Sequence, residues 1–312
     1  MDFTISPALE DLRLHIAAFV ARELIPLETD ASAYEPHQNV REDVLTAMRS
    51  KARAENLWCL QIKPEHGGRG IGRGISELLA SEGAAVAVNY RKDADAAADA
   101  VKAIEAAGGR AKAYAASVDD VEQDTAMVEA VLNDFGYVDL LVCNAGIASR
   151  GSNVVDTDPG ELPRVLATHA ISAHHLCRLV LPSMRTRPRG DVVMISSAAT
   201  SYFLGGGAPY NMAKAALEAL AYTLAKEEMR NGIHVNVVAP GLVESEMGRR
   251  LAKATGGVTD MRDVDARAPF GHVCQPVDVA RVVLWLTSDG AGYVTGQRVE
   301  CDGGVPNPAV LR

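Results

Sequence analysis

The chain has 312 residues, of which 48% are hydrophobic and 23% charged, and it contains 27 glycines. These values are typical of a folded globular protein and exclude a chain that is disordered throughout. The formal net charge of −9 argues against a nucleic-acid surface, because binding phosphates needs a basic face. No apolar run approaches the roughly 18 residues of a membrane-spanning helix, so we expect neither nucleic acid nor a membrane as partner.

The five cysteines are scattered along the sequence without a CxxC pair. An odd, unclustered set is typical of reduced thiols and does not match a disulfide framework or a zinc site. Residues 1–10 are acidic and lack the basic segment that precedes the apolar core of a secretory signal. We therefore expect a cytoplasmic protein without a bound metal.

The first 66 residues have the pattern of helices. Ser6 and Pro7 suit the cap and the first turn of a helix whose apolar residues recur at helical spacing up to Pro26. A second apolar stripe starts at Val44 and fades before Leu57. A segment this short can scarcely supply its own core, so both stripes need a partner surface.

From residue 67 onward, short β-rich runs alternate with helical patterns. Strands are predicted at residues 85–89, 112–115, 138–143, 192–196, 234–238 and 298–301. Helices are predicted at residues 71–81, 93–107, 121–134, 161–184, 209–230 and 277–287. This alternation predicts an α/β fold, a doubly wound parallel sheet of the Rossmann type that carries an N-terminal helical appendage.

A glycine-rich stretch, Gly67-Gly68-Arg69-Gly70-Ile71-Gly72, stands at the start of the helix predicted at 71–81. Glycines let the backbone approach a pyrophosphate closely, and a helix N-terminus favours negative charge. Such a stretch alone is as often a plain loop. Its place ahead of an apolar helix and a strand favours dinucleotide binding.

Tyr210 and Lys214 lie four residues apart in a predicted helix, and therefore on one face of it. A lysine ammonium near the phenol would lower its pKa from about 10, which suits a general acid for a carbonyl oxygen. Ser197 ends the preceding strand, where a hydroxyl can donate to the same oxygen. Taken alone, the pair is often two surface residues and the serine often a turn residue.

Together these residues resemble the short-chain dehydrogenase/reductase family, and the resemblance covers about Gly67 to Gly304. Further motifs of the family match in order: Asn144-Ala145-Gly146 after one strand, Pro240-Gly241 after another, then Thr295-Gly296-Gln297 and Asp302-Gly303-Gly304 near the end. Five ordered motifs with family-like spacing make the resemblance specific.

The resemblance implies a role for each matching residue. Tyr210 would be the general acid/base, Lys214 would bind the nicotinamide ribose and depress the Tyr210 pKa, and Ser197 would orient the carbonyl or alcohol. The cofactor would also be bound by Gly68, Arg69, Gly70, Ile71, Gly72, Asn144, Ala145, Gly146, Pro240, Gly241, Val243 and Ser245. Residues 246–273 would form a mobile flap over the substrate.

The family's catalytic tetrad includes an asparagine whose place is taken by His169. A histidine can donate or accept a hydrogen bond or hold a water, so a proton relay could persist. The alternative is a buried helix histidine without a catalytic role.

The choice of cofactor is also predicted. NAD-selective members carry an acidic residue after the second strand, whereas here that strand runs into Asn89-Tyr90-Arg91 with no carboxylate before Asp93. Arg69 and Arg91 could bind a 2′-phosphate, because a guanidinium matches phosphate geometry. We therefore expect NADP(H), with NAD(H) as the less favoured alternative in which the arginines point into solvent.

The family's first strand is predicted to be missing or replaced. Lys63 and Pro64 fall where strand residues belong, and Glu65 and His66 fall where its Thr-Gly turn begins. Residues 1–70 resemble instead the N-terminal helical region of acyl-CoA dehydrogenases, without that family's flavin site. We expect two parts, 1–66 and 67–312, with the apolar run Leu57–Ile62 drawn into the vacant strand position.

Three functions are open at this point. The favoured one is an NADP(H)-dependent oxidoreductase for a small-molecule carbonyl or an acyl thioester such as a 3-oxoacyl group. The second is a fusion protein with impaired cofactor binding and little activity, and the third is a fragment related to the flavin-dependent acyl-CoA dehydrogenases. By resemblance to the reductases, we expect a homotetramer in which the helices at 161–184 and 209–230 pack across a two-fold axis.

Overall fold

The structure is a computed structural model, and it describes residues 14–28, 30–33, 41, 43–44, 47–48, 51, 70–256, 261–265 and 267–304. The chain divides into two compact units, Met1–Gly67 and Gly68–Arg312. Among the predicted features, Ser6, Pro7, the run Leu57–Ile62 and the junction Lys63–His66 lie outside the described residues.

The described part of the first unit is helical. A helix covers residues 14–19, passes through a π turn, η1 (Val20–Leu24), and continues as α2 (Ile25–Glu28); a short 3-10 turn, η2 (Ala31–Ala33), follows. The helix thus runs past Pro26, where the apolar pattern stops. A proline lacks one backbone N–H, and the shifted hydrogen-bond register of the preceding π turn accommodates that loss.

Within this unit an ion pair links the two predicted helical segments. Lys51 Nζ donates to Glu23 Oε2 at 2.6 Å, and the guanidinium of Arg22 lies 5.8 Å from the centre of the Phe19 ring. Phe19 is buried, as the apolar stripe predicts.

The second unit is a parallel α/β fold, as predicted. Its strands are β1 (Ala85–Tyr90), β2 (Arg110–Ala115), β3 (Leu140–Cys143), β4 (Gly190–Ile195), β5 (Ile233–Pro240) and β6 (Arg298–Cys301). Its longer helices are α4 (Ile71–Ser81), α5 (Ala94–Ala106), α6 (Val121–Phe135), α8 (Ser172–Met184), α9 (Ala208–Glu228), α10 (Glu246–Gly256) and α12 (Pro276–Leu286). The predicted strands and helices are confirmed, with bounds that shift by a few residues.

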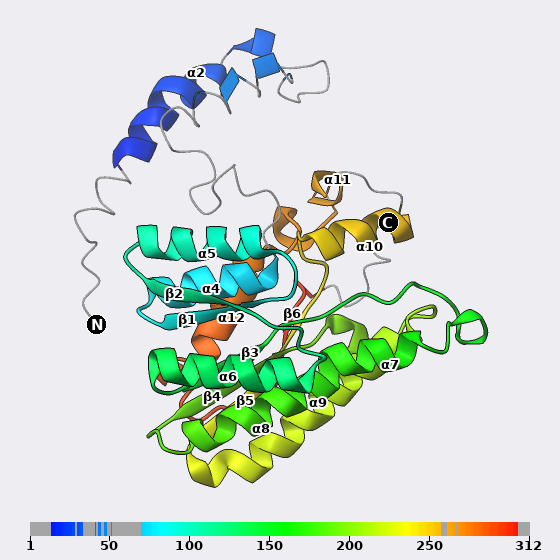
Figure 1. Cartoon of the computed structure of the whole chain (residues 1–312). Coiled ribbons are helices and arrows are strands. Elements are labelled where there is room, and N and C mark those ends of the chain that lie inside the picture. Colours follow the sequence, from blue (N-terminus) through cyan, green and yellow to red (C-terminus); the bar gives the residue numbers. More distant parts are fainter. Residues whose placement is uncertain are drawn as a thin grey trace. The chain divides into compact units, whose positions relative to one another are not determined.

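The helices cover both faces of the strands (Figure 1). Along β4 the side chains alternate: Val192 and Met194 pack in the core beneath α6, α8 and α9, whereas Val193 and Ile195 pack in the core beneath α4 and α12. This alternation follows from the two-residue period of a strand, and burial on both faces explains why β4 is apolar almost throughout.

The strands form two separate parallel sheets, β1-β2 and β3-β4-β5-β6. In the strand order 3-2-1-4-5-6 of a doubly wound sheet, the first strand lies between the second and the fourth. Here β1 and β3 take these second and fourth places, and no strand among the described residues lies between them. The residues that precede α4, 52–69, lie outside the described ones, so the expectation of a missing or replaced first strand stays a prediction.

One long helix differs from the prediction. The pattern predicts an unbroken helix over 161–184, but α7 (Glu161–Leu166) is separated from α8 by a π turn, η4 (Ala167–Ile171). This turn carries His169, which packs against the backbone at Gly146: a Cβ atom there would lie 2.4 Å from His169 Cε1. A π turn adds a residue within a helix, which the periodicity of the sequence does not report.

Candidate active site

The carboxyl ends of β4 and β5 and the first turns of α9 bring the predicted catalytic residues together. Ser197 follows β4 directly and caps a short 3-10 turn, its Oγ accepting from the Ala199 N–H at 3.2 Å. Tyr210 and Lys214 lie one turn apart on α9, and Lys214 Nζ is 5.7 Å from the centre of the Tyr210 ring. Lys214 Nζ donates to the Ile195 carbonyl, at the end of β4, at 2.7 Å.

Burial controls the ionisation of this pair. Burial raises the pKa of Tyr210. A hydrogen bond with Ser197 lowers it, but by less. Burial also lowers the pKa of Lys214 to about 7. The net direction for the Tyr210 pKa is therefore upward, set first by burial, while the buried Lys214 ammonium donates to Ile195 O. The lowering of the Tyr210 pKa by Lys214 stays a prediction.

His169 lies beside Tyr210, as the position of the family's asparagine predicts. Its ring stands edge-on to the Tyr210 ring at 5.5 Å between centres. Nε2 lies 3.1 Å from the Ile147 nitrogen and 2.9 Å from the Ile147 oxygen, while Nδ1 is buried and has no hydrogen-bond partner in the described part of the chain. Burial, with a further contribution from Lys214, lowers the pKa of His169 to about 3, so the ring is neutral.

The described glycines of the predicted phosphate turn lie at the N-terminus of α4, where Gly70 is the capping residue. A Cβ atom on Gly72 would lie only 2.6 Å from Nδ2 of Asn144, so the glycine lets the Asn144 side chain lie against the start of α4. Ile71, Gly72 and Asn144 are thus brought together, while Gly68 and Arg69 lie outside the described residues. The unpaired N–H groups of this helix start fit an anionic pyrophosphate.

The next two residues of this motif, Ala145 and Gly146, follow Asn144 on the loop after β3. Gly146 meets His169 there, so this loop connects the α4 turn with the catalytic residues.

The loop after β5 carries the residues expected to hold the nicotinamide. Pro240 is the last residue of β5, and a Cβ atom on Gly241 would lie 2.9 Å from Cβ of Asp302. Val243 is buried, and the Ser245 hydroxyl accepts from the Gly248 N–H at 3.1 Å. Ser245 therefore caps the start of α10, the first helix of the predicted flap.

The groups at the end of β1 bear on the choice of cofactor. Arg91 is exposed just beyond this strand. The Asp93 carboxylate accepts from the Ala96 N–H at 3.0 Å and so caps α5. The Asn89 amide donates to the Tyr114 and Ala116 carbonyls of the neighbouring segment.

A charged network behind Ser197 was not predicted from the sequence. Arg298, in β6, donates to Glu218 Oε1 at 3.0 Å and to the Ser197 carbonyl at 3.2 Å. Ser196 Oγ donates to the same Glu218 carboxylate at 2.5 Å. These bonds tie the serine turn to α9 and β6. Glu218 lies one turn after Lys214, which is the one local signal that could have indicated it.

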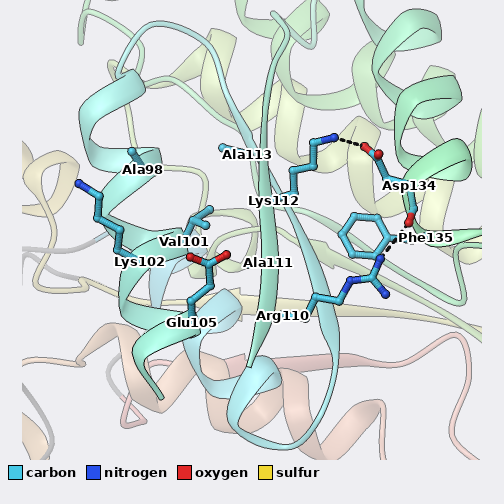
Figure 2. Close-up of a pocket in the computed structure, with 10 residues that line it drawn as sticks. All are labelled: Ala98, Val101, Lys102, Glu105, Arg110, Ala111, Lys112, Ala113, Asp134 and Phe135. Carbon is cyan, nitrogen blue, oxygen red and sulfur yellow. Dashed lines mark hydrogen bonds and ion pairs between the residues drawn. The ribbon is translucent and has the colours of Figure 1, made fainter. Parts of the chain in front are cut away.

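Two cavities of the described structure lie apart from these residues. One, of about 590 Å³, lies beside β2, where Lys112 and Arg110 both contact Asp134, as Figure 2 shows. Lys112 Nζ is 2.5 Å from Asp134 Oδ2, and Arg110 donates to the Asp134 carbonyl at 2.8 Å. The other, of about 450 Å³, is lined mostly by apolar side chains such as Phe203 and Met212. None of the predicted site residues lines either cavity.

A parallel sheet with a glycine turn at a helix start, and with serine, tyrosine and lysine at the strand ends, defines a class: the dinucleotide-binding oxidoreductases. Comparison with known proteins agrees. A family model described as enoyl-(acyl carrier protein) reductase matches residues 67–306. The chain belongs to the short-chain dehydrogenase/reductase family and is an oxidoreductase.

Curated relatives and solved structures are similar over the same share of the chain. An uncharacterized oxidoreductase of Methylorubrum extorquens is 37% identical over 245 residues, which is 76% of this chain and 94% of the relative. The 3-oxoacyl-(acyl-carrier-protein) reductase of Haemophilus influenzae is 34% identical over 238 residues, again 76% and 94%.

Among solved structures, a mutant short-chain dehydrogenase/reductase from Serratia marcescens matches with a TM-score of 0.69 and 32% identity, over 77% of this chain and 95% of that one. A 7α-hydroxysteroid dehydrogenase in complex with NADH and 7-oxo glycochenodeoxycholic acid matches with a TM-score of 0.69 and 29% identity, over 76% and 91%. Among the described residues, no helix is long and apolar enough to cross a membrane.

Proposed function

We propose that this chain is an NADP(H)-dependent oxidoreductase that moves a hydride between the nicotinamide and a carbonyl or secondary alcohol, with 3-oxoacyl thioesters as the substrate class. The observation that carries the proposal is that Ser197, at the carboxyl end of β4, lies together with Tyr210 and Lys214, in the first turns of α9. The similarity to the 3-oxoacyl-(acyl-carrier-protein) reductase of Haemophilus influenzae supports the thioester substrate.

In this function the side chains of the protein supply the proton that the carbonyl oxygen receives. When bound, NADPH supplies the hydride. Tyr210 Oη donates its proton to the carbonyl oxygen, and Ser197 Oγ donates a hydrogen bond to the same oxygen. The raised Tyr210 pKa keeps the phenol protonated at neutral pH, as a general acid requires.

His169 acts in this scheme as a neutral group. With a pKa of about 3 it does not become an imidazolium at neutral pH. Its Nε2 is held by Ile147, and its buried Nδ1 has no described partner, so a hydrogen bond from Nδ1 to a water near Tyr210 would satisfy it.

The preference for NADP(H) over NAD(H) rests on the groups near β1. The Asp93 carboxylate is committed to the cap of α5, which leaves no acidic group at the strand end to bind ribose hydroxyls. Arg91 is exposed there, and a guanidinium suits a 2′-phosphate. Arg69 is proposed as its companion.

We also propose that residues 1–70 are related to acyl-CoA dehydrogenases and that the chain forms a homotetramer. The family match begins at residue 67, so the kinship of residues 1–70 with acyl-CoA dehydrogenases rests on their own pattern. A homotetramer is supported by the exposed apolar side chains of Ile171, before α8, and Met212, on α9. Light scattering tests it, and a monomer mass at micromolar concentration would contradict it.

The second candidate function is a reductase fold that binds its cofactor poorly. It is favoured by the residues Lys63–His66, which replace the family's strand end and Thr-Gly turn, and by the two separate sheets that the described residues form. Nicotinamide fluorescence on mixing with NADPH separates the two candidates.

Tyr210→Phe tests the favoured function. The variant loses the proton donor but keeps the ring that packs against His169, so we expect the reduction rate to fall about 10²–10⁴-fold while NADPH binding stays within a few fold. The rate of NADPH oxidation with a 3-oxoacyl thioester measures the first effect, and nicotinamide fluorescence measures the second. Retention of more than about a tenth of kcat would show that the proton comes from elsewhere.

A further inference from the structure

Two cysteines from separate parts of the sequence lie next to each other in the second unit. Cys274 Sγ and Cys301 Sγ are 3.9 Å apart. Cys274 lies just before α12, and Cys301 is the last residue of β6. Both side chains are partly exposed, so reagents in solution have access to them.

The backbone of each cysteine holds one part of the segment 240–245. The Gly241 N–H donates to the Cys301 carbonyl at 3.0 Å, and the Glu244 N–H donates to the Cys274 carbonyl at 2.8 Å. Val243 and Cys274 also form a parallel β-bridge. A covalent bond between the two sulfurs would therefore fix the anchors on both sides of this segment.

We propose that Cys274 and Cys301 are a site of reversible disulfide formation, oxidised by a low-molecular-weight disulfide such as oxidised glutathione. The site's effect on the cofactor rests on the proposed function, in which the segment 240–245 holds the nicotinamide. The thiol chemistry itself does not.

The reaction has two exchange steps. The Cys301 thiolate attacks one sulfur of glutathione disulfide, forms a mixed disulfide, and releases one glutathione thiolate. Cys274 then gives its proton to solvent and attacks the Cys301 sulfur, which releases the second glutathione. Two protein thiols are oxidised to one disulfide, and the glutathione disulfide is reduced to two thiols.

The surroundings of the pair favour Cys301 as the attacking group. The hydrogen bond between the two sulfurs lowers the pKa of Cys301 and raises that of Cys274. The carboxylates of Asp278 and Asp302 act in the raising direction on both. A thiolate that is partly exposed is the reactive form of cysteine.

A second cysteine pair provides an internal control. Cys143, at the end of β3, and Cys177, in α8, are only 8% and 2% exposed. The pKa of Cys177 is raised, first by its hydrogen bond with Cys143 and then by burial. Neither thiol of this pair is accessible, so we expect both to stay reduced in the folded chain.

The experiment treats the full chain with oxidised glutathione, alkylates the remaining thiols, and maps the peptides by mass spectrometry. We expect a peptide in which Cys274 and Cys301 are linked, and its loss on treatment with dithiothreitol. The linked protein should melt about 5 °C or more above the reduced one, because the bond closes a loop in the unfolded chain. Reduced Cys274 and Cys301 after treatment would overturn the proposal.

Three variants sharpen the test. Cys274→Ser should form no cross-link but should carry a glutathione adduct on Cys301, because the attacking thiolate remains. Cys301→Ser should form no cross-link, and its adduct at Cys274 should form more slowly than the adduct at Cys301 in Cys274→Ser. Cys177→Ala should form the cross-link as the native chain does. Faster adduct formation at Cys274 in Cys301→Ser than at Cys301 in Cys274→Ser would contradict the assigned direction of attack.

Adding NADPH separates the site from the proposed function. If the segment 240–245 holds the nicotinamide, saturating NADPH should slow cross-linking about threefold or more, because the bound segment resists the movement that brings the sulfurs together. A chain that binds no NADPH yet forms the cross-link would contradict the proposed function alone. A chain that binds NADPH yet keeps both cysteines reduced would contradict the disulfide site alone.

Discussion

Burial sets the charge state of the groups around Tyr210. It lowers the pKa of Lys214 to about 7, lowers that of His169 to about 3, and raises that of Tyr210. A phenol that keeps its proton beside a neutral imidazole is ready to donate, which suits the direction of carbonyl reduction. The sequence predicted these residues but not this electrostatics, because desolvation depends on packing that spacing does not report.

Arg69 and Arg91 are the residues proposed to bind the 2′-phosphate of NADPH. The double variant Arg69→Ala with Arg91→Ala should weaken NADPH binding at least about tenfold more than NADH binding, because only NADPH carries the phosphate that a guanidinium would pair with. Fluorescence titration with both cofactors measures the two affinities. Arg178→Ala, on the exposed face of α8, is a matched control for loss of positive charge. An equal loss for both cofactors would contradict the assignment.

Residue pairs that are distant in sequence mark the limit of what the sequence predicts. The motifs around Ser197, Tyr210 and Lys214 are local, and the structure brings them together as expected. The bond from Arg298 to Glu218 joins residues 80 positions apart, and no spacing rule connects them. Such a contact becomes apparent only once β6 and α9 are packed.

Helix α6 carries a buried carboxyl group, that of Asp124. Asp124 is fully buried, and neither of its oxygens has a hydrogen-bond partner in the described part of the chain. Burial first, and then the nearby charges of Asp120 and Asp119, raise its pKa from 3.8 to about 7. The folded chain thus holds a proton that the unfolded chain releases between about pH 4 and pH 7.

This proton makes stability depend on pH in a defined direction. In the window from about pH 4 to pH 7 the folded state binds more protons than the unfolded state, so the contribution of Asp124 to stability decreases as the pH rises. Asp124→Asn removes the titration, and we expect it to be about 1–3 kcal/mol more stable than the native chain at pH 8, with a smaller difference at pH 5.

Urea unfolding at the two pH values measures this difference. Glu122→Gln, an exposed carboxylate on the same helix, should show no such pH dependence. A gain for Asp124→Asn that is equal at pH 5 and pH 8 would contradict the role of ionisation.

The starts of two helices, α5 and α6, coincide with capping side chains. Asp93 and Asp120 cap α5 and α6 through their carboxylates, and both helices begin within one residue of the predicted starts at 93 and 121. The π turn η4 was not predicted, and it carries His169, which meets the backbone at Gly146. The periodic pattern thus predicts these helix starts but not the break at η4, where residues distant in the sequence are in contact.

For the whole molecule, the feature that matters most is the separation of the two sheets. From Pro64, which cannot donate to a central ladder, and from the residues that replace the Thr-Gly turn, the sequence predicts a first strand that is missing or replaced, not two separate sheets. The described residues include no strand between β1 and β3. How Leu57–Ile62 and the junction Lys63–His66 meet this gap stays a prediction, because these residues lie outside the described ones.

Rewriting the junction tests its cost. With Lys63→Leu, Pro64→Val, Glu65→Thr and His66→Gly together, we expect NADPH to bind at least about tenfold more tightly, because a carboxylate near a pyrophosphate costs up to about 4 kcal/mol at 4 Å. Lys63→Leu with Pro64→Val alone separates the strand from the turn and should give a smaller gain. Fluorescence titration measures all three proteins, and equal affinities would show that the native junction does not impair the site.

In the proposed reaction, the second unit moves a hydride from NADPH to a carbonyl carbon. The most direct measurement incubates the full chain with a 3-oxoacyl thioester and NADPH that is fully deuterated at C4 of the dihydronicotinamide ring, and determines the mass of the product. The account predicts a 3-hydroxyacyl thioester that carries a single deuterium at the new carbinol carbon, formed much more slowly by Tyr210→Phe. A product without deuterium, or no product although NADPH binds, would contradict it.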